Sequence, residues 1–70
     1  MATIQITNTA GRKEFIDLPD NLAWALAELC KRITFSDCRS NASDEDEAYR
    51  MIEATDKLRT VLGRVGYAPR

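Results

Sequence analysis

Apolar residues in the last third of the chain recur at spacings of four and three, which places them on one face of a helix. This seam consists of Met51, Thr55, Leu58, Leu62 and Val65. It is widened by Ala48, Ile52, Ala54 and Val61. The apolar arc covers about half of the helix circumference, which is more than one neighbouring helix needs.

Both ends of this helix carry sequence signals. Ser43 is able to cap the first free backbone N–H groups, and Asp46 follows three positions later. At the other end Gly66 suits a left-handed closing residue, Tyr67 is placed to fold back, and Pro69 prevents continuation. The pattern predicts a helix at about residues 44–65.

A second apolar stripe precedes it and begins after the helix-start residues Pro19 and Asp20. Its members are Leu22, Leu26, Leu29 and Ile33. This predicts a helix at about residues 20–33, antiparallel to the later one. The stripe is expected to contact Met51, Leu58 and Leu62. Residues 34–43 are interpreted as a loop, with Phe35 closing the core and partner binding by the loop as the alternative.

The N-terminal residues alternate with a period of two, as in a strand. Thr3–Thr7 is rich in β-branched residues, Phe15–Leu18 is a second strand, and Asn8–Arg12 with Gly11 supplies the turn. The inner face is expected to hold Ile4, Ile6, Ile16 and Leu18. The hairpin therefore spans about residues 2–18. An isolated hairpin is marginal in water, so it must lie on the helices or extend into a larger sheet through a partner.

The order hairpin, helix, helix predicts a helix-dominated α+β fold of the ββαα type, with residues 1–70 as a single domain. At 70 residues the burial of apolar surface barely exceeds the conformational entropy lost on folding. A second copy is one remedy. We therefore expect a homodimer whose interface includes Ala54, Val61 and Val65, the part of the later helix that the first helix leaves uncovered.

Catalytic and metal-binding chemistry has little support in the sequence. The chain has no His and two Cys, so it lacks a tetrahedral ligand set, and no nucleophile has a base to activate it. The sequence predicts no enzyme activity, metal or cofactor. Cys30 is interpreted as a core residue, whereas Cys38 lies in the predicted loop, with a reactive thiol as one alternative.

No N-terminal signal segment is visible, and no run approaches the ~20 apolar residues that span a bilayer. The expected location is the cytoplasm, with both thiols reduced and no membrane contact.

Two aromatic residues fall outside the apolar stripes. Trp24 lies about 180° around its helix from the leucine stripe. Either the hairpin covers it, or it anchors another chain, because Trp and Tyr often dominate binding energy at interfaces. Tyr49 raises the same alternatives.

The charges are segregated along the later helix, although the net charge is only −1. Asp44, Glu45, Asp46 and Glu47 stand at its start. They suit the helix dipole, antiparallel pairing of two copies, or contact with a basic, nucleic-acid-processing partner by imitating phosphates. Near its end Arg59, Arg64 and Arg70 give an alternative reading, a self-associating regulatory protein that contacts nucleic acid. The near-neutral charge makes direct nucleic-acid binding the less favoured reading.

Three segments of the chain resemble a family of short, uncharacterised proteins of proteobacteria and their mobile elements. They are Arg32-Ile33-Thr34-Phe35-Ser36-Asp37, Asp44-Glu45-Asp46-Glu47-Ala48-Tyr49 and Gly66-Tyr67-Ala68-Pro69-Arg70. The resemblance covers about residues 20–70 and implies a bacterial, phage or mobile-element origin, with no activity or site to transfer. Small anti-CRISPR inhibitors are similar in size and charge. The expected function is a non-catalytic protein-protein interaction module, of which an inhibitor of a host defence complex is one form.

Overall fold

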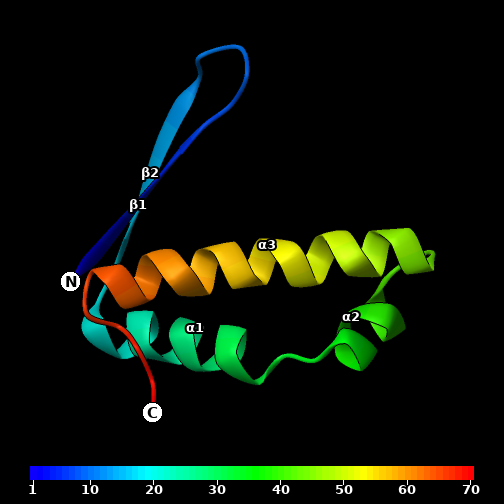
Figure 1. The fold of residues 1–70 in the computed structure, drawn as a ribbon. Coiled ribbons are helices and arrows are strands. Elements are labelled where there is room, and N and C mark those ends of the chain that lie inside the picture. Colours follow the sequence, from blue (N-terminus) through cyan, green and yellow to red (C-terminus); the bar gives the residue numbers. More distant parts are fainter.

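An N-terminal hairpin rises from a layer of three helices in the computed structural model, which describes residues 1–70 (Figure 1). The elements are β1 (Ala2–Thr7), β2 (Lys13–Leu18), α1 (Asp20–Arg32), α2 (Phe35–Asn41) and α3 (Glu45–Arg64). The helices α1 and α3 run antiparallel. The structure confirms the helix-dominated α+β class and the hairpin-first order, but it contains one helix more than the sequence predicted.

The hairpin is closed by a three-residue loop of the type I turn and bulge kind. Gly11 takes a φ of 84°, and its N–H donates to Asn8 O over 3.0 Å. The Asn8 N–H donates in turn to Arg12 O. Because the loop needs one left-handed residue at this position, Gly11 fixes where the chain reverses. The predicted turn at residues 8–12 is confirmed.

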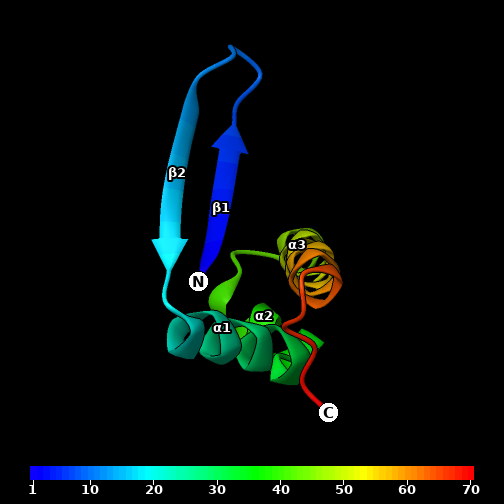
Figure 2. The same cartoon turned by 90° about the vertical axis from the view of Figure 1, so that its left-hand side faces the viewer.

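The strand register places the expected apolar residues on one face, because Ala2 is opposite Leu18 and Ile4 is opposite Ile16. Coverage of this face decreases along the hairpin. Ala2 is 8% exposed at the base, whereas Ile6 is 66% exposed near the tip. The helices thus cover only the base of the hairpin, which projects beyond them (Figures 1 and 2).

Small side chains form the contact face of α1. Ala23 and Ala27 are fully buried and Cys30 is 3% exposed. The prediction that the leucine stripe faces α3 is wrong for Leu22 and Leu29, which are 51% and 59% exposed, whereas Leu26 and Ile33 are half-buried. The axes of packed helices lie about 8–10 Å apart, and small residues at the contact favour the shorter distances. Leucines facing each other would hold the two axes farther apart.

The segment after α1 is a short helix, so the interpretation of residues 34–43 as a loop is wrong. Thr34 and Asp37 form a capping box around its start: the Asp37 N–H donates to Thr34 Oγ1, and the Thr34 N–H donates to Asp37 Oδ2. The helix buries Cys38 at 2% exposure. Its single apolar pair, Phe35 and Cys38, is too short a pattern to reveal a helix from periodicity.

The ends of α3 lie close to their predicted positions. Asp44, and not Ser43, is the capping residue, since Asp44 Oδ1 accepts from the Glu47 N–H over 2.8 Å. Glu47 Oε1 in turn accepts a hydrogen bond from the Ser43 N–H. At the other end Gly66 has a φ of 105°, and the Tyr67 N–H donates to Leu62 O. This is the left-handed closure that the sequence predicted.

The molecule is thin and extended, with principal extents of 37 × 34 × 16 Å. Its radius of gyration is 13.3 Å, against about 11 Å for a compact domain of this length. Its accessible surface is 5425 Å², whereas a compact monomer of this mass exposes about 4,400 Å². Only Leu62 among the large apolar side chains is buried. The other large apolar side chains are therefore half-buried or exposed.

We predict that Ala27→Leu destabilises the fold by about 1–3 kcal/mol, because the added atoms have no space between α1 and α3. Leu29→Ala, at an exposed position two residues later in the same helix, should change the free energy of unfolding by less than about 0.5 kcal/mol. Urea denaturation measures both values. If Leu29→Ala destabilised the fold more than Ala27→Leu, Leu29 would have to lie in the contact between α1 and α3.

Candidate interaction surfaces

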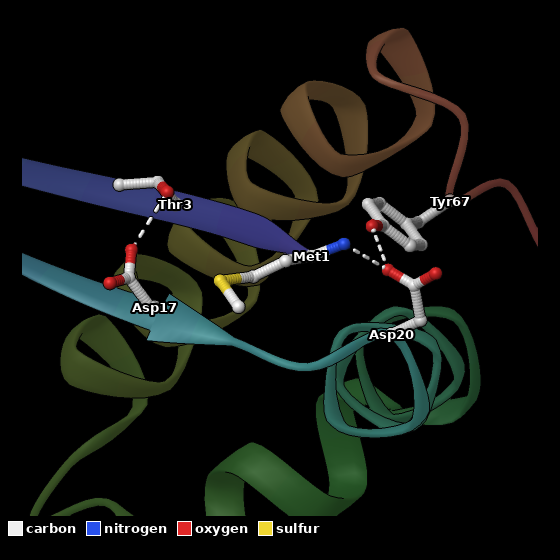
Figure 3. A network of polar contacts seen from close by, with 5 residues as sticks. All are labelled: Met1, Thr3, Asp17, Asp20 and Tyr67. Carbon is white, nitrogen blue, oxygen red and sulfur yellow. Dashed lines mark hydrogen bonds and ion pairs between the residues drawn. The ribbon is translucent and has the colours of Figure 1, made fainter.

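The hairpin, α1 and the C-terminal segment meet at Asp20, the first residue of α1 (Figure 3). Asp20 Oδ1 accepts from the Met1 amino group over 2.6 Å and from the Tyr67 hydroxyl over 2.7 Å. The same carboxylate lies at the positive end of the α1 dipole, where a negative charge is favoured. One side chain thus joins residues that are far apart in the sequence.

Hydrogen bonding at this junction changes two ionisation equilibria. The bond from the N-terminal amine, the bond from Tyr67 and the charge of the amine lower the pKa of Asp20 below its ordinary value. The bond to Asp20 raises the pKa of Tyr67. Asp20 is exposed and Tyr67 is half-buried. The two bonds hold the N-terminus and the C-terminal segment to the start of α1.

Trp24 is covered by the C-terminal segment and not by the hairpin. Its ring meets Tyr67 edge-on, with the centroids 5.4 Å apart and the planes at 77°. The interpretation that the hairpin packs over Trp24 is therefore wrong. The ring remains 41% exposed, and its use as an anchor for another chain stays a prediction.

Tyr49 stands at the opposite end of the helical layer. It is 56% exposed and stacks on Phe35, with the centroids 4.6 Å apart. Helix α3 rises about 22 Å between residues 49 and 64, and Tyr67 with Trp24 lies beyond that point. Because the strongest interface contacts cluster near one centre, Trp24 and Tyr49 do not form one compact binding site.

The four acids at the start of α3 divide into two pairs. Asp44 and Glu47 are engaged in the backbone bonds that cap the helix. Glu45 and Asp46 are exposed and make no side-chain hydrogen bond or ion pair within the chain. Only the second pair is free to attract a basic partner without loss of the helix start.

The C-terminal segment covers one side of the α1–α3 pair. Tyr67 contacts Trp24 of α1, and Tyr67 and Pro69 line a hollow of about 320 Å³ together with Thr60 and Gly63 of α3. Asp56, Arg59 and Ala68 complete its lining. The base of the hairpin lies on the opposite side of the α1–α3 pair (Figure 2), where several apolar side chains of both helices remain exposed.

Five exposed apolar residues lie on that side, which we call the helix flank. Leu22 lies about 160° around α1 from Trp24, and Val61 lies about 160° around α3 from Gly63. The helix flank consists of Leu22, Leu29, Ala54, Val61 and Val65. The structure thus adds α1 residues to the predicted interface of Ala54, Val61 and Val65. Their role in a dimer stays a prediction.

The remaining candidate groups are separate from the helix flank. Cys30 is buried as predicted, and this burial raises the pKa of its thiol. Cys38, for which a reactive loop thiol was one alternative, is buried in α2. Both thiols are free. No cluster of three metal-ligating side chains is present, and no helix is long and apolar enough to cross a membrane.

Comparison with known proteins places the chain in a family. The model of a family of unknown function, DUF7706, matches residues 1–70. The chain belongs to this family. The match includes the hairpin, which the resemblance seen in the sequence left out. No curated protein and no solved structure matches the chain at a significant level.

We predict that Asp20→Asn makes this DUF7706 protein less stable at neutral pH but not at low pH. Since the folded-state pKa of Asp20 is lowered, its contribution is complete above the ordinary value of about 4 and is lost as the pH falls through the folded-state pKa. Thermal midpoints from pH 7 to pH 2 should therefore converge for parent and variant. Glu53→Gln, at an exposed position of α3, is the control. A constant difference at every pH would contradict this role.

Proposed function

We propose that this DUF7706 protein is a non-catalytic interaction module that acts by binding the surface of another protein through its helix flank. The observation that carries the proposal is the exposure of large apolar side chains on one side of the helical layer. Leu29 is 59% and Val65 is 66% exposed.

Single exposed apolar residues are normal on a protein surface, but a set gathered on one side marks a binding surface. Here two helices contribute to one side, and the domain has almost no large buried side chain to offset the cost of this exposure. A protein partner that covers the helix flank would remove this apolar surface from water. The helix flank therefore suits an apolar helix or groove of the partner.

The free acids of α3 favour a partner with a basic rim. Glu45 and Asp46 stand at the α2 end of the layer, outside the apolar residues of the helix flank. Charges at the rim of an interface mainly increase the association rate and reject wrong partners. The apolar residues then determine how long the complex lasts.

A narrower form of this proposal is inhibition of a host defence complex by a protein of a phage or mobile element, as in anti-CRISPR inhibitors. Its support is the resemblance of three sequence segments and the acidic start of α3, which suits the basic surface of a nucleic-acid-processing complex. The cytoplasm of the bacterial host is the corresponding location. Trp24 and Tyr49 remain predicted contacts at the two ends of the layer.

The alternative function, direct contact with nucleic acid, has less support from the geometry. Arg59 and Arg64 lie about 140° apart around α3. Arg59 lines the C-terminal hollow, and Arg70 follows α3 in the C-terminal segment. The three guanidinium groups thus do not share one face, whereas nucleic-acid binding uses a basic patch or stripe.

The proposal predicts that Val61→Glu abolishes partner capture from a bacterial lysate, while Thr60→Glu does not. Both changes add one negative charge to neighbouring exposed residues of α3, but only Val61 lies on the helix flank. A charge buried without a partner should weaken binding at least tenfold. Affinity purification with quantitative mass spectrometry measures the captured proteins. Equal capture by both variants and the parent would remove the helix flank as the binding surface.

A second prediction concerns the two free acids. Glu45→Lys with Asp46→Lys should slow association with the captured partner several-fold at low salt and reduce its salt dependence, because steering is electrostatic. The dissociation rate should change little. Surface plasmon resonance at two ionic strengths measures both rates, and circular dichroism checks that α3 is intact. A changed dissociation rate with an unchanged association rate would place these acids inside the interface.

A further inference from the structure

The outer edge of β2 carries a pattern that is complementary to itself. The sheet has two strands, so each strand has one unpaired edge. The bond from the Asn8 N–H to Arg12 O fixes the alternation of the ladder. It follows that the backbone N–H and C=O groups of Lys13, Phe15 and Asp17 point away from β1. These three side chains also share one face, because alternate residues of a strand do.

The geometry points to a twofold dimer in which the β2 edges of two copies pair antiparallel around Phe15 and form a four-stranded sheet. In this register Phe15 lies opposite the partner's Phe15, and Lys13 lies opposite the partner's Asp17. Each of the three outward-pointing residues then finds backbone partners in the second copy. This proposal concerns a second copy of the chain and is independent of the partner proposed for the helix flank.

The side chains of this edge fit a second copy of themselves. Phe15 is 59% exposed, and an aromatic pair across two strands is stabilising. Lys13 has no ion pair within the chain, and its cross-strand neighbour is the uncharged Thr7. Asp17 accepts a hydrogen bond from Thr3 over 2.8 Å, which leaves its second oxygen available (Figure 3). Two Lys–Asp pairs thus flank the central aromatic pair.

Shifted registers lose this match. A shift of the pairing that brings Glu14 opposite the partner's Glu14 opposes like charges, and one centred on Lys13 opposes two lysines. Charged residues on edge strands usually prevent association. Here the positive Lys13 and the negative Asp17 each lie two residues from Phe15, so opposite charges meet when two copies pair. The charge pattern therefore disfavours these two shifted registers, whereas the register centred on Phe15 pairs opposite charges.

The second edge of the hairpin is less suitable. Figure 2 shows β1 on the side of α3 and β2 on the outer side of the hairpin. Strand β1, with the sequence ATIQIT, contains no charged residue, so its edge specifies no register by charge. The outer edge of β2 is therefore both open and specific.

The surface area supports a second copy as the occupant. The chain exposes 5425 Å², about 1,000 Å² more than a compact monomer of its mass. A standard interface buries about 800 Å² from each partner. The excess thus matches what one stable interface would remove. Antiparallel pairing also sets the tip of each hairpin, near which Ile6 is exposed, beside the base of the other, where the helices lie.

The test is the molecular mass of charge-reversed variants by sedimentation velocity at about 100 µM. The parent should sediment as a dimer of twice 7.9 kDa. Lys13→Asp and Asp17→Lys should each weaken the dimer at least tenfold, because both ion pairs become repulsive. An equimolar mixture of the two variants should restore a dimer, since each then meets the opposite charge. The double variant Lys13→Asp, Asp17→Lys should also restore it.

Two controls separate edge pairing from other effects. Glu53→Lys makes the same change of net charge as Asp17→Lys, but on α3, and should leave the dimer intact. Circular dichroism should show every variant folded, because Lys13 and Asp17 are exposed. A monomeric parent, unweakened single variants, or folded variants that do not associate on mixing would each overturn the proposal. Loss of lysate capture by Val61→Glu with a retained dimer would leave both proposals standing, because the two surfaces are separate.

Discussion

The buried side chains that helix α1 presents to its neighbours are all small, and the rest of the architecture depends on this. Ala23, Ala27 and Cys30 allow two helices to approach closely, but they remove little apolar area from water. The larger apolar side chains are then displaced to the side of the pair or onto the hairpin. A thin layer with an uncovered flank follows directly from this choice of contact. Part of the stability must therefore come from helix capping, from the hydrogen bonds at Asp20 and from a partner bound to the helix flank.

The elements of this fold were largely predictable, whereas the way they pack was not. Alternation in Thr3–Thr7, the glycine at position 11 and the closure at Gly66 are local signals, and the structure confirms each of them. The leucine stripe is also a real amphipathic pattern. Periodicity shows which residues share a face, but it does not say whether that face meets the chain itself or a partner. For that reason Leu22 and Leu29 were wrongly assigned to the helix contact.

Short-range chemistry explains the other differences. Helix α2 is specified by the capping box of Thr34 and Asp37, a signal that the sequence carries but that the predicted loop did not use. The bond from Thr34 lowers the pKa of Asp37, consistent with a carboxylate that caps a helix. Of the candidate contact residues, the acids were correctly placed at the start of α3. The separation of Trp24 from Tyr49 depends on how the C-terminal segment folds back, which no local pattern shows.

The connection between β2 and α1 gives the hairpin a mechanical role. One residue, Pro19, joins the end of the strand to the first residue of the helix, with a φ of −54°. Hinges usually need several residues whose torsions change together, and the proline ring holds one of the few available torsions fixed. The hairpin therefore behaves as a stiff lever attached to α1. A force applied at its tip would produce torque at Asp20, where the N-terminal amine and Tyr67 converge, and would be transmitted to the C-terminal segment.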